Sequence, residues 1–226
     1  MKELNIAFRP TISKPLLRQN QVEKRLQWAT EHKEYDWDRI IFSDESSFWV
    51  GNTLKRAWSE KGGNLIQRSV KHPAKLHVWG CFSKLGFGKL IIFSQNLDAQ
   101  FMRKIYQRGL LPSANMWYGK DNRNWCLQED NDPKHRSRLC RAWKEENDVD
   151  VLDWPSQSPD ANPIENVWSI IKHRLRGKQI CTIEQLRRHI KRIWKALPLS
   201  YAEKLVESMP SRCDAIIKNG GDWTLY

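Results

Sequence analysis

The chain of 226 residues is long enough for one domain with a full hydrophobic core, alone or with a short arm. Its 38 lysine and arginine residues outnumber 26 acidic residues, and this net charge of +12 favours a polyanionic partner such as nucleic acid. Five cysteines without a Cys-x-x-Cys pair or a Cys/His cluster argue against a disulfide framework or a zinc site and indicate reduced thiols in an intracellular protein. No apolar run approaches the roughly 18 residues of a membrane span.

The N-terminal part is expected to be an arm followed by one docking helix. Residues 1–13 have no usable periodicity. Within residues 14–32, Val22, Leu26 and Ala29 recur at helical spacing, with charged residues between them. This part of the chain is therefore expected to pack as a helix against a larger domain.

A long strand is predicted over residues 37–50, with Asp44 near its middle. Alternation places Phe42, Asp44 and Phe48 on one face of this strand and Glu45 on the other. Acids are disfavoured in strand interiors, so Asp44 or Glu45 needs a reason to be there. A solvent-facing edge strand is the alternative that this strand alone leaves open.

A basic segment follows, and residues 51–75 are predicted to be loop-like. A solvated hairpin and a loop that contacts a phosphate backbone or a partner subunit are both open here. The basic residues of the segment are Lys55, Arg56, Lys61, Arg68, Lys71 and Lys75, against the single acid Glu60.

The next part of the chain predicts a hairpin and then a helix. Strands over residues 76–82 and 89–93 are joined by a glycine-containing turn, which lacks the Gly-Lys-Ser/Thr ending of a nucleotide-binding loop. Asp98 is expected to cap a helix that ends at about residue 108. A turn region is then expected over residues 112–124.

A short strand over residues 125–128 leads into three acids within four residues. Pro133 is a natural first residue of a helix, which predicts Asp132 as the N-cap of that helix. Asp130 is then left at the carboxyl end of the strand, where ligands of such sheets usually lie. Another short strand is expected over residues 150–153.

The run from Trp154 to Glu165 contains three prolines that keep the backbone extended or turned. A helix is predicted from Pro163 to about Arg176, with Asn162 as its N-cap. Glu165 is then the third helical residue, where a capping box is the alternative to a functional role. It lies about 100° round from Ile164, at the border of the apolar stripe.

Two further amphipathic helices are predicted near the C-terminus. Thr182 and Gln185 have the spacing of a capping box and open the first, and the second covers about residues 200–208. The outer face of the first helix is basic, and either solvation or DNA contact explains it. That face carries Arg187, Arg188, Lys191, Arg192 and Lys195.

Two strands that carry Asp44 and Asp130 and a helix that carries Glu165 make a coherent metal site. Carboxylates are hard oxygen ligands that suit Mg²⁺ or Mn²⁺. Two such ions at one phosphate can activate a water or a 3′-hydroxyl and stabilise the leaving oxygen. Three clustered acids with no basic neighbour would repel one another, and the bound ions would make such a cluster tolerable. The surrounding lysine and arginine residues would hold the phosphate backbone.

Four segments resemble successive signatures of the Tc/mariner superfamily of DNA transposases, in the same order: residues 42–46, 78–82, 128–135 and 154–168. The likeness extends from about Trp37 to the C-terminus and is greatest to the branch that includes Sleeping Beauty, whose third acid is Glu. It implies an α/β fold of the RNase H-like type (retroviral integrase superfamily), with a mixed central sheet flanked by helices. It also implies a clamp-like loop over residues 51–75 and a glycine-rich hairpin insertion around Gly80 and Gly88.

The resemblance places the three acids of the family on Asp44, Asp130 and Glu165, as the ligands of two Mg²⁺ or Mn²⁺ ions. The spacing from Asp130 to Glu165 is the one expected for that branch, and Asp132 would shorten it by two residues. The implied activity is cut-and-paste transposition: hydrolysis at transposon ends and transfer of the 3′-hydroxyl into TA target DNA. The implied partners are double-stranded DNA and further copies of the chain in a synaptic complex, in the nucleus. DNA contacts are expected from Lys55, Arg56, Lys61, Arg68, His135, Lys172, Arg176 and Lys178.

One departure concerns the N-terminal side, because the family places a bipartite helix-turn-helix region ahead of the catalytic domain. Nothing before Trp37 resembles it. Residues 1–36 are therefore expected to be a linker remnant with the docking helix, and residues 37–226 the RNase H-like catalytic domain, which binds DNA weakly and without recognition of transposon ends. Whether such a domain acts alone stays open. The alternatives are a non-catalytic DNA-binding or assembly module derived from a transposase, and a general RNase H-like nuclease.

Overall fold

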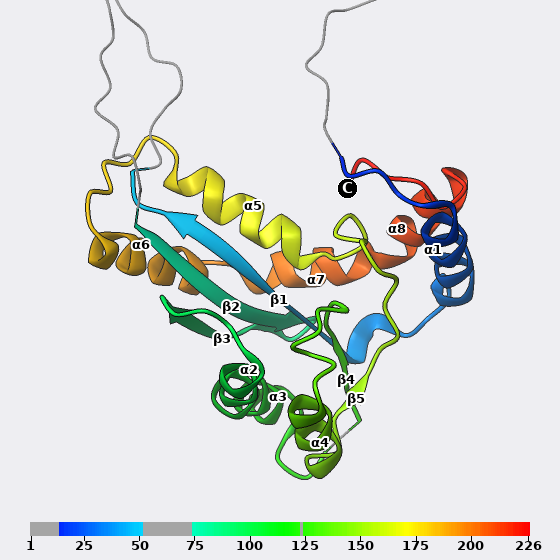
Figure 1. Cartoon of the computed structure of the whole chain (residues 1–226), viewed down its shortest axis with the longest axis horizontal. Coiled ribbons are helices and arrows are strands. Elements are labelled where there is room, and N and C mark those ends of the chain that lie inside the picture. Colours follow the sequence, from blue (N-terminus) through cyan, green and yellow to red (C-terminus); the bar gives the residue numbers. More distant parts are fainter. Residues whose placement is uncertain (1–13, 52–73, 123) are drawn as a thin grey trace, which may run out of the picture.

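Five strands form one mixed sheet at the centre of the molecule (Figure 1). The computed structural model describes residues 14–51, 74–122 and 124–226. The strands are β1 (Ile40–Trp49), β2 (Lys75–Ser83), β3 (Gly86–Phe93), β4 (Cys126–Gln128) and β5 (Asp150–Val151), in the order β3-β2-β1-β4-β5. The pairs β1–β2 and β2–β3 are antiparallel, whereas β1–β4 and β4–β5 are parallel. The first predicted strand is shorter than expected, because a 3₁₀ turn, η1 (Trp37–Arg39), precedes β1.

Helices cover both faces of this sheet (Figure 1). One face carries α2 (Ala99–Ile105), η2 (Tyr106–Leu110), α3 (Leu111–Tyr118) and α4 (Arg138–Glu146). The other carries α5 (Ile164–Leu175), α6 (Ile183–Lys195), α7 (Leu199–Glu207) and α8 (Met209–Lys218), with α1 (Gln19–His32) packed against α8. Phe42 and Phe48 belong to the core under α5 and Ile41 to the core under α2, so the predicted alternation of β1 is confirmed.

The helix after Asp98 is longer than predicted. Asp98 caps it as expected, accepting a hydrogen bond from the Phe101 N–H at 2.7 Å. The chain then stays helical through the π-helical η2 and through α3 to Tyr118, so the turn expected over residues 112–124 is wrong for most of its length. Pro112 lies inside this helical run, where the π-helical turn η2 passes into α3 and the Leu111 N–H bonds to the Tyr106 carbonyl.

The helix predicted to start at Pro133 begins only at Arg138. Ser137 is its cap and accepts a hydrogen bond from the Cys140 N–H at 3.2 Å. Asp132 caps a turn in place of the helix, since its carboxylate accepts from the Lys134 N–H at 3.0 Å. The Asp132 carboxylate is therefore still used in a local backbone hydrogen bond, so its role differs from the one predicted for Asp130.

Further along the chain, α5 begins at Ile164, one residue after the predicted start, so its N-cap is Pro163 and not Asn162 as predicted. The Asn162 side chain still accepts from the Ile164 N–H at 3.4 Å. The apolar stripe predicted for this helix is buried throughout. The predicted capping box of Thr182 and Gln185 is present at the start of α6. The strand expected over residues 150–153 is only two residues long. Helix α8 was not predicted from the sequence.

The proline-rich approach to α5 is held by contacts from both ends of the described chain. Arg25 of α1 is fully buried and binds both carboxylate oxygens of Asp160, at 2.8 and 2.7 Å. The Thr224 N–H donates to the same carboxylate at 2.9 Å. Arg212 of α8 donates to the Asp160 carbonyl at 2.9 Å and to the Asn166 side chain at 2.7 Å. The segment that leads to Glu165 is thus tied to α1, α8 and the C-terminal residues.

Candidate active site

The pairing of β1 with β4 sets the relative positions of Asp44 and Asp130. Phe42 pairs with Gln128 in parallel register, and the Ser43 hydroxyl donates to the Gln128 carbonyl at 3.1 Å. Asp44 and Asp130 each lie two residues beyond this pair, so both lie at the same edge of the sheet. Because side chains alternate along an extended chain, both lie on the face covered by α5.

Helix α5 brings Glu165 and Trp168 to Asp44. The Trp168 indole N–H, one turn after Glu165, donates to Asp44 Oδ2 at 2.9 Å. Burial, together with the charges of Glu45 and Glu165, raises the pKa of Asp44 well above its usual value, although the Trp168 hydrogen bond opposes the shift. Burial also raises the pKa of Glu165, against the charge of Lys172. Within the described chain the Glu165 carboxylate makes no hydrogen bond, so the capping-box alternative is not supported.

Gly80 makes room for Trp168 at this site. It pairs with Asp44 across β1 and β2, and a Cβ atom there would lie 2.9 Å from Trp168 Cη2 and 2.6 Å from Trp194 Cη2. The sequence placed Gly80 in a hairpin insertion and gave no role to Trp168, so the part of both residues in the site was not predicted. A glycine inside an apolar strand often marks a close approach of another group, and that was the available signal. The hairpin itself is β2–β3 of the central sheet.

Asp130 has basic neighbours, contrary to the expectation that the acids would have none. His135 Nε2 lies 3.2 Å from Asp130 Oδ1, and the Asp132 N–H donates to the same oxygen at 3.0 Å. Burial acts to raise the pKa of Asp130, but these hydrogen bonds and the charges of His135 and Lys134 outweigh it and hold the pKa below its usual value. Asp130 is therefore ionised near neutral pH.

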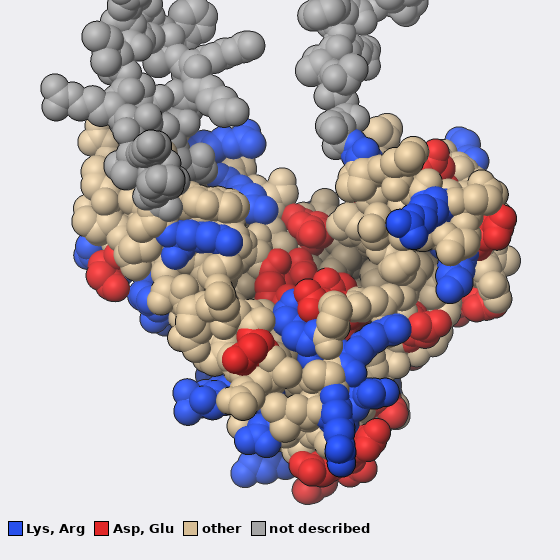
Figure 2. Space-filling model, in the orientation of Figure 1, with Lys and Arg blue, Asp and Glu red and all other residues tan. Residues whose placement is uncertain are grey.

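The three acids share one face but do not form a closed ligand set. In residues 14–51, 74–122 and 124–226, no three Asp, Glu, His or Cys side chains are arranged to hold a metal ion. Asp44 is bound to Trp168, and Asp130 to His135 and Asp132. Figure 2 shows acidic side chains gathered around a hollow near the middle of the view, with lysine and arginine side chains around them. An all-carboxylate set with uncompensated charge at Asp44 fits a hard divalent cation, which takes only one or two protein carboxylates if it is Mg²⁺.

The predicted DNA-contact residues fall in different places. Arg176 and Lys178 are exposed after α5, whereas Lys172 is half-buried, with its Nζ 5.9 Å from the centre of the Phe48 ring. His135 is only 3% exposed and lies among acids, so the structure does not present it on the surface where DNA would reach it. Lys55, Arg56, Lys61 and Arg68, and nearly all of the predicted clamp-like loop, lie outside the described residues. None of the helices in the described ranges is long and apolar enough to cross a membrane.

A comparison against protein families gives a match over most of the chain. Residues 39–187 match the family described as DDE superfamily endonuclease, and the chain belongs to this family.

Relatives of this chain include the transposases of the Tc1 and Tcb1 elements. The chain is 32% identical over 236 residues to the transposable element Tc1 transposase of Caenorhabditis elegans, an alignment that covers 100% of this chain and 85% of the relative. It is 34% identical over 228 residues to the transposable element Tcb1 transposase of Caenorhabditis briggsae, covering 96% of this chain and 82% of the relative. The chain is a transposase catalytic domain of the Tc1/mariner type, and its enzyme class is that of the polynucleotidyl transferases.

Solved structures confirm the RNase H-like fold. The mariner Mos1 paired end complex with Mg aligns with a TM-score of 0.86 at 17% identity, covering 98% of this chain and 69% of that chain. The catalytic domain of Mos1 mariner transposase aligns with a TM-score of 0.75 at 16% identity, covering 94% of this chain and 100% of that chain.

Proposed function

We propose that this chain cleaves and joins DNA in cut-and-paste transposition, with Asp44, Asp130 and Glu165 as the ligands of two divalent metal ions. The observation that carries the proposal is geometric: Asp44 and Asp130 each lie two residues beyond the Phe42–Gln128 pair, on the face covered by α5, whose first turn carries Glu165. Asp44 is buried near Glu45 and Glu165, whose charges repel its own and raise its pKa. A bound divalent cation would remove that repulsion. The parallel register of β1 and β4 supports Asp130, and not Asp132, as the second acid.

The residues of the chain have separate tasks in this proposal. Trp168 fixes the Asp44 carboxylate through one oxygen, and His135 keeps Asp130 ionised. Glu165 comes from the rigid first turn of α5. Mg²⁺ or Mn²⁺, when bound, would supply Lewis-acid chemistry that activates a water or 3′-hydroxyl and stabilises the leaving oxygen.

Double-stranded DNA is the proposed partner, at transposon ends and at a TA target. The net charge of +12 supports phosphate binding, and Lys172, Arg176 and Lys178 lie on or just beyond α5, the helix that carries Glu165. The aligned Mos1 structures include a paired-end complex with a left transposon end and a strand transfer complex of that protein. By analogy we propose that this chain also self-associates on DNA, in the nucleus.

Glu165→Gln tests the proposal because it keeps the size of the side chain and removes its charge. Cleavage of a linear DNA duplex with Mn²⁺, measured beside the parent, should fall to the background of the assay, with an unchanged melting temperature. Glu207→Gln is the matched control, because Glu207 is exposed at the end of α7. This variant should cleave DNA at the parental rate. Cleavage by Glu165→Gln at the parental rate would exclude the ligand role. Preferential cleavage of RNA–DNA hybrids would favour the general nuclease instead.

A further inference from the structure

A second pair of acids lies on the opposite face of the sheet. Glu45 follows Asp44 in β1, and Glu129 precedes Asp130 after β4, so alternation turns both toward η2 and α4. Glu129 is 5% exposed, and the Glu45 side chain is 17% exposed. We call Glu45 and Glu129 the back acids, and Asp44, Asp130 and Glu165 the front acids.

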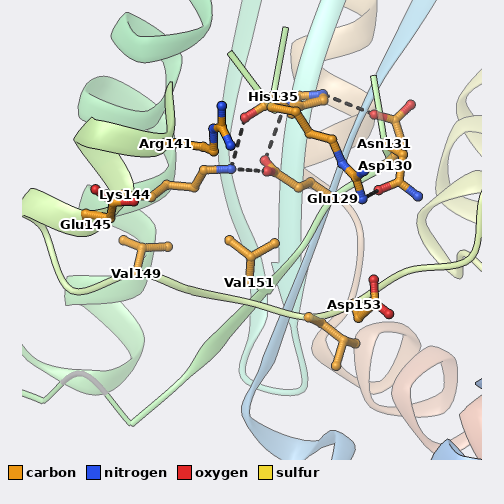
Figure 3. Close-up of a pocket in the computed structure, with 12 residues that line it drawn as sticks. Glu129, Asp130, Asn131, His135, Arg141, Lys144, Glu145, Val149, Val151 and Asp153 are labelled. Carbon is orange, nitrogen blue, oxygen red and sulfur yellow. Dashed lines mark hydrogen bonds and ion pairs between the residues drawn. The ribbon is translucent and has the colours of Figure 1, made fainter. Parts of the chain in front are cut away.

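Protein cations compensate the back acids. The Lys144 ammonium of α4 binds the Glu129 carboxylate, and Figure 3 shows these two groups pointing toward each other beside His135. Lys134 Nζ lies 3.2 Å from Glu45 Oε2, and His135 Nε2 lies 3.5 Å from Glu45 Oε1. This face therefore has its negative charge balanced within the chain.

His135 connects the two faces. Its Nδ1 lies 2.9 Å from the Tyr106 hydroxyl and 3.3 Å from Glu129 Oε2, and its Nε2 lies 3.2 Å from Asp130 Oδ1. The Tyr106 hydroxyl donates to Glu129 Oε2 at 2.6 Å, which leaves its oxygen to accept from His135 Nδ1–H. With an acceptor at each ring nitrogen, His135 donates from Nε2–H to Asp130. The Lys144 ammonium also donates to the His135 carbonyl at 3.2 Å and fixes its backbone.

The contacts to Asp130 leave one of its oxygens available. Both His135 and the Asp132 N–H act on Oδ1. Oδ2 has no hydrogen-bond partner among the described residues. A carboxylate held by one oxygen keeps a fixed orientation while the other oxygen faces a ligand, which is how outer groups orient metal-binding side chains.

We propose that Tyr106, Glu129 and Lys144 are positioning residues for Asp130 and that they act through His135. This proposal rests on the proposed function, because the orientation of the Asp130 carboxylate affects activity only if Asp130 is a metal ligand. The network is more than a buried ion pair in the core, because its last hydrogen bond leaves the core and ends on a front acid. A pocket of about 340 Å³ opens beside Asp130, lined in part by Glu129, His135 and Lys144.

Tyr106→Phe removes one hydroxyl and leaves the ring stacked on Trp143, whose centroid is 5.2 Å away. Mn²⁺ binding to the full chain in the presence of a blunt DNA duplex would be followed by the spin-resonance signal of free Mn²⁺. We expect the apparent Kd for Mn²⁺ to rise about tenfold, within the range for loss of an outer partner. The melting temperature should change little. Tyr201→Phe, at a half-buried tyrosine of α7, is the matched control and should bind like the parent.

Two further measurements separate positioning from simple support of the fold. In long-range ¹H–¹⁵N spectra of the parent, both ring nitrogens of His135 should show protonated signals, and Tyr106→Phe should shift the Nδ1 signal. In a His135→Gln background, Tyr106→Phe should add no further loss of Mn²⁺ affinity, because both changes interrupt one path.

Asp130→Asn makes the outcomes distinguishable. If it leaves Mn²⁺ binding unchanged, the proposed function fails and this proposal fails with it. If Asp130→Asn weakens binding while Tyr106→Phe changes neither the Kd nor the His135 signals, only the positioning role is overturned. Additive losses in the His135→Gln background would also overturn it.

Discussion

The two faces of the central sheet carry acids at adjacent positions in the chain, and the back acids differ from Asp44 at the front in how their charge is compensated. The back acids, Glu45 and Glu129, are balanced by Lys134, His135 and Lys144. At the front, Asp44 has carboxylates as its charged neighbours, and its pKa is raised well above the usual value by burial and by those charges. Removing one partner of a compensated buried pair destabilises a fold, whereas uncompensated acids are typical of sites that bind a ligand.

The largest expected effect follows from neutralising a front acid. Asp44→Asn should lower DNA cleavage at least about a thousandfold, since metal ions contribute several kcal/mol to such reactions. Without added metal its free energy of unfolding should equal or exceed that of the parent, because a source of repulsion is gone. Single-turnover cleavage and urea unfolding measure the two quantities. A clear loss of stability would show that Asp44 holds the fold together.

Substitution at the back face, in contrast, should lower the free energy of unfolding. Lys144→Met leaves Glu129 buried without its ion-pair partner and should cost about 3–5 kcal/mol of unfolding free energy. The double variant Glu129→Gln/Lys144→Met should recover part of that loss, as urea titrations can show. Equal losses in the single and double variants would mean that packing of the lysine stem, not charge, is what matters.

Metal addition sharpens the comparison further. At about 100 times its Kd, Mn²⁺ should stabilise the parent by about 2.7 kcal/mol, and thermal unfolding with and without Mn²⁺ reports this gain. Asp44→Asn should lose most of it, whereas Glu207→Gln should keep it. A gain retained in Asp44→Asn would place the metal away from the front acids.

The smallest expected effect is on pH dependence without metal. The pKa of Asp44 is higher in the folded chain than in the unfolded one, so the folded chain binds more protons above about pH 4. Its contribution to stability therefore falls as pH rises from that value. Burial opposes protonation of His135, but Asp130 and Glu45 raise its pKa to about 10, and its contribution falls from about pH 6.5 to about 10. Between pH 4 and 6, the Asp44 contribution lowers the free energy of unfolding of the parent as pH rises, and this contribution should be absent in Asp44→Asn. Urea unfolding of both chains across this pH range measures the difference.

Local patterns were sufficient for the elements that carry the front acids. The period of two in β1 placed Phe42 and Asp44 on one face, and the apolar stripe of α5 predicted its buried side. The same kind of reasoning failed at Pro133, where helix preference predicted a start that the structure delays to Arg138. There the chain stays in a turn that brings His135 between Glu45 of β1 and Asp130, which follows β4. This contact between distant segments cannot be predicted from the helix preferences of single residues.

The missed parts of the candidate site depend on contacts between distant residues. Trp168 meets Asp44 from 124 positions away, and only the packed structure shows that Gly80 leaves the space for it. The burial of His135 likewise needs Glu45 from β1 and Tyr106 from η2. By contrast, α8 was within reach of the sequence, since Met209, Cys213 and Ile216 have helical spacing and Pro210 lies in the first turn, where it is tolerated.

The contact between Arg25 and Asp160 has a consequence for how the chain can be divided. We propose that the docking helix and the domain over residues 37–226 fold as one unit, because a fragment that starts at Trp37 would bury Asp160 without its partner. The connection at Glu34, Tyr35 and Asp36 is exposed and is the natural place for a nick. A chain cut there should remain assembled, and a synthetic peptide that spans α1 should complement the shortened fragment. The helix α1 would then bind the rest of the domain through non-covalent contacts alone, without the peptide connection.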